Sequence, residues 1–219
     1  MMKSGLFFDV DGTLIDSRAD LATAVNLTRC HYGLSEYAEE TVVGFVGDGI
    51  KNLALRSFRE LPETEQAGAL ELLRRFYAEH EVEQTVLYPG VSEGLVRLKS
   101  AGFSLAVFTN KPTPDALHIL DVLGIAGYFD EIIGAGMEFP IKPAPDAIFH
   151  LLAKFNLNRQ TSWMLGDNHT DMAAARQSGV RRGYAAWGFG SLRGEGYDAE
   201  FCDFPAFVRA MMLDLNPAD

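Results

Sequence analysis

The chain has 219 residues, of which 47% are hydrophobic and 22% are charged. That length fits one large domain or a medium domain with a small insertion, and the composition excludes disordered and fibrous proteins. The formal net charge of −11 argues against nucleic-acid binding, which requires a basic surface, and no apolar run approaches the roughly 18 residues of a membrane span, so we expect neither partner.

The first predicted element is a short buried strand. Residues 6–8 form an apolar run that is closed by Asp9 and by a turn-forming sequence at residues 10–13. A run of this length with such an ending predicts a strand. The following residues predict a helix with Ser17 as its N-cap and Asp20 in its first turn.

Residues 17–84 have a helical pattern and contain no convincing alternating strand. Leucine and aromatic residues recur at helical spacing between residues 62 and 83, while glycines interrupt the pattern at Gly44 and within residues 47–49. This stretch is interpreted as an all-helical insertion after the first strand.

From residue 85 onward, predicted strands and helices alternate. The strands are expected at residues 103–108, 129–133, 163–165 and 183–187, and the helices at residues 91–101, from Thr113, from Lys142 and at residues 170–178. Such alternation is typical of parallel βαβ units. We therefore predict an α/β fold in which residues 1–16 and 85–219 form the core and residues 17–84 form an inserted helical domain.

Polar side chains follow several of the predicted strands. Because ligands bind beyond the carboxyl ends of parallel strands, these residues are the candidates for a site: Asp9, Asp11, Thr109, Asn110, Asp167, Asp171 and, at the start of a helix, Lys142. Carboxylates gathered on one edge repel each other unless a divalent cation lies among them. Oxygen ligands favour Mg²⁺, which is the cofactor we expect.

This set of residue types suits phosphoryl transfer, which mainly requires positioning and charge neutralisation on the phosphate oxygens. An aspartate can serve as the nucleophile and form an aspartyl-phosphate. A second carboxylate two residues along the chain can protonate the leaving oxygen and then activate water. The turn at Gly12 and Thr13 would let the backbone approach the phosphate closely.

Four motifs resemble those of the haloacid dehalogenase superfamily of phosphohydrolases. They are Asp9-Val10-Asp11-Gly12-Thr13-Leu14, Thr109-Asn110, Lys142-Pro143-Ala144-Pro145 and Gly166-Asp167-Asn168-His169-Thr170-Asp171. All four occur in the family's order, and the resemblance covers nearly the whole chain. The resemblance implies a Rossmann-like core with a helical cap and a Mg²⁺-dependent phosphatase.

The resemblance also implies a role for each matched residue. Asp9 is the implied nucleophile and a metal ligand, and Asp11 is the implied general acid/base, with its backbone carbonyl on the metal. Thr109 and Lys142 would hold the phosphoryl group with Asn110 beside them, and Asp167 would complete the metal site with Asp171 close behind it. Asn168 departs from the serine that family members often have at this position.

The helical insertion resembles the cap of the phosphoglycolate phosphatase and β-phosphoglucomutase branches. The sequence at residues 45–53, with Arg56 beyond it, is most similar to phosphoglycolate phosphatases. This similarity implies that Gly47, Asp48 and Gly49 contact the substrate, and that the substrate is 2-phosphoglycolate. A closing cap would exclude water and admit only small phosphorylated metabolites.

Several alternatives stay open. A sugar-phosphate mutase would use the same core residues, and a non-enzymatic receiver module also combines aspartate, threonine and lysine. The helical insertion and the length of the chain argue against the receiver module. A degenerate family member that serves as a scaffold is disfavoured by the intact acidic set. A dehalogenase is disfavoured by the acid at Asp11. We expect a monomer or a homodimer.

The two cysteines, Cys30 and Cys202, lie far apart in the sequence. A disulfide framework or a zinc site would require more, and more closely spaced, ligands. We therefore expect two ordinary thiols in a reducing cytoplasm, and no secretory signal, because Asp9 breaks the first apolar segment.

Overall fold

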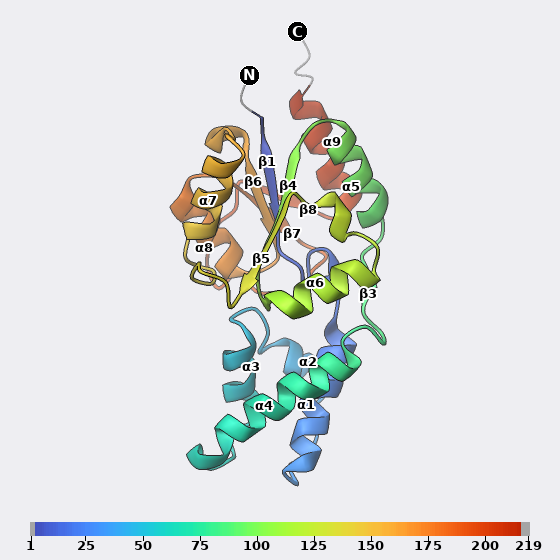
Figure 1. The fold of residues 1–219 in the computed structure, drawn as a ribbon, viewed down its shortest axis with the longest axis vertical. Helices are drawn as coiled ribbons and strands as arrows, with labels where there is room; N and C mark the ends of the chain where they lie inside the picture. The colour runs from blue at the N-terminus through green and yellow to red at the C-terminus, as the bar shows by residue number, and fades with distance from the viewer. Residues whose placement is uncertain (1–2, 216–219) are drawn as a thin grey trace.

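The computed structural model describes residues 3–215, which contain one six-stranded sheet (Figure 1). Its strands stand in the order β5-β4-β1-β6-β7-β8, and neighbouring strands are parallel. In chain order they are β1 (Gly5–Phe8), β4 (Ser104–Pro112), β5 (Glu131–Ala135), β6 (Trp163–Gly166), β7 (Arg181–Ala185) and β8 (Ala199–Phe201). The predicted α/β fold is confirmed.

Helices cover both faces of the sheet. On one face lie α7 (Asp146–Lys154) and α8 (His169–Ser178), and on the other lie α5 (Val91–Ser100), α6 (Thr113–Val122) and α9 (Phe204–Leu215) (Figure 1). Two short 3-10 turns, η1 (Ala126–Tyr128) and η2 (Arg159–Thr161), precede β5 and β6.

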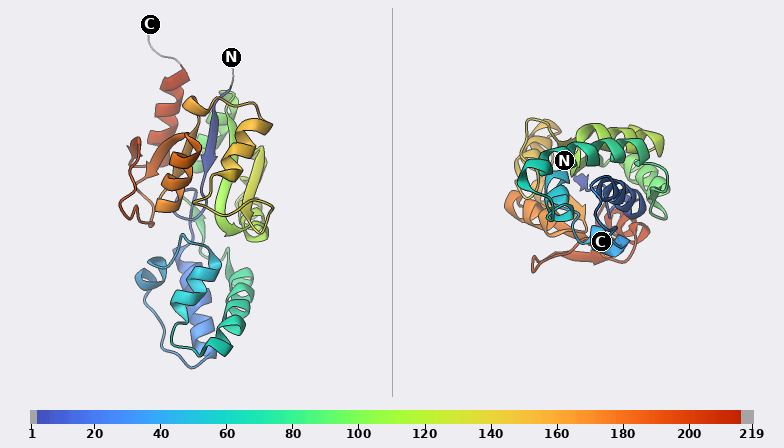
Figure 2. Two further views of the ribbon diagram at one scale, coloured as in Figure 1. Left: turned by 90° about the vertical axis from the view of Figure 1, so that its left-hand side faces the viewer. Right: turned by 90° about the horizontal axis from the view of Figure 1, so that it is seen from below.

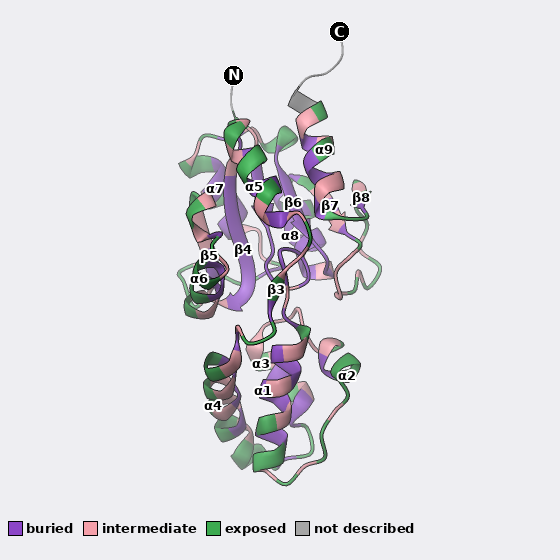
Figure 3. Ribbon diagram, turned by 90° about the vertical axis from the view of Figure 1, so that its right-hand side faces the viewer, coloured by how far each residue is buried: buried purple, intermediate pink, exposed green. Residues whose placement is uncertain are grey.

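The central strands β1, β4 and β6 are buried on both faces, as the burial colours of Figure 3 show for β4 and β6. Successive residues of a strand point to opposite faces, and β1 shows this clearly. Phe8 lies 5.9 Å from the ring centroids of both Phe204 and Phe207 of α9, whereas Phe7 packs into the cluster that includes Ile148 and Leu151 of α7. Continuous apolar runs such as residues 6–8 are what two covered faces require.

A helical bundle of α1 (Arg18–His31), α2 (Glu39–Val43), α3 (Ile50–Ser57) and α4 (Glu63–His80) lies beyond the carboxyl ends of the strands (Figures 1 and 2). Its own apolar interior includes Val25, Val42, Phe58 and Leu73. Within residues 17–84 the structure contains helices and loops but no strand.

Two short connections join the helical bundle to the sheet. They pair antiparallel as β2 (Ile15–Asp16) and β3 (Val86–Leu87). Beside them the buried carboxylate of Asp20 accepts hydrogen bonds from the backbone N–H of Gln84 at 3.0 Å and of Thr85 at 2.8 Å, and from the Thr85 hydroxyl at 2.7 Å. The start of α1 is thereby tied to the segment that returns to the sheet.

Several predicted boundaries are wrong, for identifiable reasons. β4 continues through Thr109 and Asn110, because after an irregularity its last residue, Pro112, pairs with Ala135 of β5. Lys142 does not open a helix: α7 begins at Asp146, since residues that precede prolines avoid the helical conformation. β7 begins two residues before the predicted start.

Ser17 precedes α1 as predicted, but its side chain does not cap the helix. Its hydroxyl donates instead to Asp11 Oδ1 at 2.6 Å. The pair β2–β3, strand β8 and helix α9 were not predicted, because each is short or lies beyond the regular alternation.

Candidate active site

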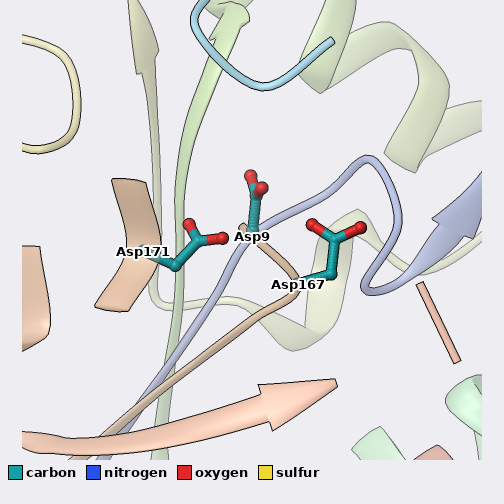
Figure 4. Close-up of side chains that lie close together, drawn as sticks. All are labelled: Asp9, Asp167 and Asp171. Atoms are coloured by element: carbon teal, nitrogen blue, oxygen red, sulfur yellow. The ribbon is translucent and has the colours of Figure 1, made fainter. Parts of the chain in front are cut away.

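Three buried carboxylates meet at the carboxyl edge of the sheet. Asp9 follows β1, Asp167 follows β6 and Asp171 lies in the first turn of α8. One oxygen of each lies within 4.8 Å of the others, and Figure 4 shows the three side chains turned toward one another. Parallel neighbouring strands place their ends together, which is why residues so far apart in sequence converge here.

A single lysine lies against this cluster. Lys142 Nζ donates to Asp171 Oδ1 at 2.6 Å and lies 2.8 Å from Asp9 Oδ1, with its side chain only 1% exposed. That second contact lacks hydrogen-bond geometry, so Asp9 Oδ1 is buried with no hydrogen-bond donor in the described part of the chain.

The charges of the cluster are not balanced by its neighbours. Burial, together with the negative charges of Asp171 and Asp9, raises the pKa of Asp167 well above its usual value. Burial also raises the pKa of Asp171, although Lys142 opposes this effect. A divalent cation among the three carboxylates would remove the repulsion and give Asp9 Oδ1 a partner. The donor set therefore fits a hard cation.

Asp167 is fixed by a loop that follows β7. Its Oδ2 accepts hydrogen bonds from the backbone N–H of Phe189 at 2.9 Å and of Gly190 at 2.7 Å. A Cβ atom on Gly12 would collide with this carboxylate, and Gly12 has a φ of 78°. Glycine at position 12 thus satisfies both the backbone conformation and the close approach of Asp167.

Asp11 does not belong to the cluster of three carboxylates. Besides Ser17, its carboxylate accepts two hydrogen bonds from Lys111 Nζ, at 2.9 Å to Oδ1 and 3.0 Å to Oδ2. Lys111 also donates to the hydroxyl of Tyr77, on α4 of the helical bundle, at 2.6 Å. Burial disfavours the ammonium, but Asp11 and Tyr77 together raise the pKa of Lys111 above its usual value.

Asn110 uses its side chain to hold the backbone of its neighbours. Its Oδ1 accepts from the Lys142 N–H at 2.8 Å, and its Nδ2 donates to the carbonyl oxygens of Lys142 and Gly47, each at 3.0 Å. Thr109 is buried, and its hydroxyl accepts from the backbone N–H of Lys111 at 3.2 Å. Asn110 therefore positions Lys142 and the bundle loop at Gly47.

The bundle loop of residues 47–49 rests on the sheet edge. A Cβ atom on Gly47 would collide with the side chain of Asn168. Asp48 forms ion pairs with Arg56 of α3 and, at 3.1 Å, with Arg193, and it lies 3.4 Å from His169. Burial raises the pKa of Asp48, but Arg56 and Arg193 lower it more, so that it lies below its usual value.

A cavity of about 60 Å³ lies between the helical bundle and the sheet edge. Its polar side is formed by Asp9, Asp11, Thr109, Asn110, Lys111 and Asp167, and its apolar wall by residues such as Leu21, Val46, Ile50, Leu53 and Leu73. Gly47 and Gly49 line the cavity, and Asp48 lines a neighbouring groove. Four other predicted site residues do not line the cavity: Gly12, Thr13, Lys142 and Asp171.

Several residues at this site were not predicted. Lys111 and Ser17 donate to Asp11, and Tyr77 accepts from Lys111. The N–H groups of Phe189 and Gly190 hold Asp167. The glycine-rich sequence at residues 188–196 was the available signal for the last two. No pattern in the sequence singles out Lys111, because its contacts depend on the continuation of β4.

The sequence model of the haloacid dehalogenase-like hydrolases matches residues 6–185. The chain belongs to this family. It is 34% identical over 190 residues to the phosphoglycolate phosphatase of Aquifex aeolicus, covering 87% of this chain and 88% of that one. It is 35% identical over 219 residues to the enzyme of the same name from Yersinia pseudotuberculosis, covering 98% and 92%.

Solved structures agree with these relatives. The crystal structure of a predicted phosphoglycolate phosphatase from Haemophilus somnus superposes with a TM-score of 0.90 at 30% identity, and the match covers 96% of this chain and 98% of that one. The predicted family and the predicted phosphatase class of this chain are confirmed. Within residues 3–215 no helix is long and apolar enough to cross a membrane.

Proposed function

We propose that this phosphatase hydrolyses 2-phosphoglycolate with Mg²⁺ through an aspartyl-phosphate on Asp9. The observation that supports this most is the convergence of Asp9, Asp167 and Asp171 beside Lys142, under a small cavity roofed by the helical bundle. The names of the relatives at about 35% identity support the substrate.

Asp9 and Asp167, with Asp171 behind them, would hold the Mg²⁺, together with the backbone carbonyl of Asp11. When bound, the ion would neutralise charge on the phosphoryl oxygens. The glycine at position 12 and the N–H groups of residues 189 and 190 keep Asp167 in place for this task.

The protein side chains would perform the covalent steps. An Asp9 carboxylate oxygen attacks phosphorus, and the bond from phosphorus to the ester oxygen breaks while Asp11 donates a proton to that oxygen. Asp11 then takes a proton from the water that attacks the phosphorus of the acyl phosphate, which releases inorganic phosphate and restores Asp9. Lys142 and the Thr109 hydroxyl stabilise the charge on the transferred group.

We propose that residues 17–84 act as a cap on a core of residues 1–16 and 85–219. The paired connections β2 and β3 mark the point where the chain passes between them. Closure of the cap would place the loop of Gly47 and Gly49 over the phosphoryl group and exclude water.

The test is release of inorganic phosphate from 2-phosphoglycolate. We expect multiple turnovers that stop when divalent metal is chelated and resume when Mg²⁺ is added. Isomerisation of a sugar phosphate without phosphate release would instead support the mutase, and a single turnover would support a receiver module. Full activity in a rigorously metal-free assay would contradict the metal site.

A further inference from the structure

Lys111 is the one cationic side chain among the described residues that line the cavity. It is buried, with a side-chain exposure of 3%. In the structure its ammonium is shared between the Asp11 carboxylate and the hydroxyl of Tyr77, and it lies 4.6 Å from the centroid of the Tyr77 ring. Lys111 thus stands between the proposed acid/base of the core and the wall formed by the helical bundle.

Most of the rest of that wall is apolar. Leu21, Leu53 and Leu73 present only apolar atoms to the cavity, and an unpaired carboxylate placed among them would pay a large desolvation penalty. The nearby Asp115 is a carboxylate itself. Among the described residues of the lining, Lys111 is therefore the one cationic partner for a substrate with a negative charge beyond its phosphate.

The covalent structure of the substrate fits this placement. In 2-phosphoglycolate the carbon that bears the ester oxygen also bears the carboxylate, so the two groups are only a few ångströms apart. The ester oxygen must reach Asp11 to receive its proton. The Asp11 carboxylate is in direct contact with Lys111 Nζ at 2.9 Å, so the substrate carboxylate would come within reach of the same ammonium.

We propose, on the basis of the proposed function, that Lys111 binds the carboxylate of the substrate and determines its class. The substrate carboxylate replaces Asp11 in the ion pair with Lys111, and Asp11 is released to approach the ester oxygen. The preferred substrates are phosphomonoesters with a carboxylate on the carbon that bears the ester oxygen. In a chain with a net charge of −11, Lys111 would supply the positive charge for the substrate carboxylate.

The other cations of the helical bundle are less suitable. Arg56 is occupied by the carbonyl oxygen of Phe45, at 2.8 Å, and by Asp48. Lys51 is exposed on α3, and neither residue lines the cavity. Lys51 therefore provides a matched control, since it is a lysine close to the site that lines the neighbouring groove and not the cavity.

The experiment compares kcat/KM for 2-phosphoglycolate with kcat/KM for ethyl phosphate, which has the same ester but no carboxylate. We expect wild type to prefer 2-phosphoglycolate, and Lys111→Met to lower this preference about 100-fold or more, because a buried polar partner would be lost. Lys51→Met should leave the preference unchanged. Lys111→Gln, which keeps hydrogen-bond donors beside Asp11 and Tyr77, provides the same test if the methionine variant does not fold.

The possible results separate the two proposals. If Lys111→Gln lowered kcat/KM equally for both substrates, or lowered it for neither, the carboxylate-binding role would be overturned. So would a wild-type enzyme that hydrolyses both substrates equally well, although that result would leave the phosphatase activity intact. A wild-type enzyme that releases phosphate from neither would contradict the proposed function itself.

Discussion

At the scale of single residues, the site depends on how closely the backbone approaches Asp167. Three glycines surround this residue: a Cβ atom on Gly12 or Gly188 would collide with its side chain, and one on Gly190 would lie 2.7 Å from its backbone carbonyl oxygen. The absence of these side chains allows a buried carboxylate to be held by two N–H groups while one oxygen stays available.

Gly12→Ala tests this arrangement. The variant should displace Asp167 and lower kcat about 100-fold or more, since displacement of a catalytic group by about 1 Å has effects of this size. Gly124→Ala is the matched control, because Gly124 has a φ of 73° with nothing near its Cβ position. Both variants should lose about 1–2 kcal/mol of stability from left-handed strain. Steady-state kinetics that showed equal kcat in the two variants would refute this explanation.

Glu81 is a buried carboxylate outside the proposed chemistry. It ends α4, and its Oε2 has no hydrogen-bond partner among the described residues. Burial, with the negative charges of Asp115 and Asp11, raises its pKa to about 7, while Lys111 opposes this shift. His118 lies 3.8 Å from it. The folded state therefore binds more protons at Glu81 than the unfolded state does between pH 4.5 and 7.

Stability should therefore fall as the pH rises from 4.5 to about 7. We expect Glu81→Gln to be more stable than wild type by about 1–3 kcal/mol at pH 8 and equally stable at pH 4. The measurement is urea unfolding at both pH values, with the exposed Glu79→Gln as control. A variant less stable than wild type at pH 8 would show that the Glu81 carboxylate is stabilising instead.

Part of this residue-scale picture was predictable from the sequence. Asp9 and Asp167 follow apolar runs that end at one sheet edge, so their meeting follows from the topology alone. The contact between Lys111 and Asp11 could not be predicted, because it depends on the irregularity that continues β4 to Pro112 and on the packing of Tyr77 from a helix outside the sheet.

At the scale of elements, the loop of residues 47–49 is the point where the helical bundle meets the sheet edge. Asp48 forms an ion pair with Arg56 of the helical bundle. It also lies close to two residues outside the bundle, Arg193 and His169. Asn110 adds a hydrogen bond to the Gly47 carbonyl. These contacts hold the proposed cap against the core in the structure.

Arg193→Ala should weaken this contact. The ion pair with Asp48 is partly exposed, so its loss should raise KM about two- to fivefold with little change in kcat, and the difference should shrink at high salt. Arg176→Ala is the control, because Arg176 pairs at 3.1 Å with Glu195 and not with the bundle. Equal KM values for the two variants at low salt would argue against the contact's role.

The elements themselves were predictable where a strong period was present. The alternation after residue 85 predicts strands and helices that the structure confirms, although their ends differ by a few residues. Strand β8 has only three residues, and β2 and β3 have two each, which is too short for an alternating pattern to be recognised.

At the scale of the whole molecule, two connections hold the helical bundle to the sheet, and Asp20 ties them together. Its carboxylate is buried and accepts from three donors of residues 84 and 85. Loss of this carboxylate would leave buried N–H groups without acceptors. The Asp20 hydrogen bonds therefore join the two connections between the helical bundle and the sheet.

Asp20→Ala should therefore lower the free energy of unfolding by about 2–4 kcal/mol. The exposed Asp121→Ala should change it by no more than about 0.5 kcal/mol. Denaturant unfolding measures both. If Asp20→Ala were as stable as Asp121→Ala, the Asp20 hydrogen bonds would not be what joins the two connections.

The most direct test of the account is to trap the phosphoryl group on Asp9. Acid quenching of wild type mixed with 2-phosphoglycolate labelled at phosphorus should leave label covalently attached to the protein within the first turnover. In Asp9→Asn, which should retain the fold, we expect neither covalent label nor phosphate release. Label retained by Asp9→Asn, or normal turnover by this variant, would contradict the proposed covalent mechanism.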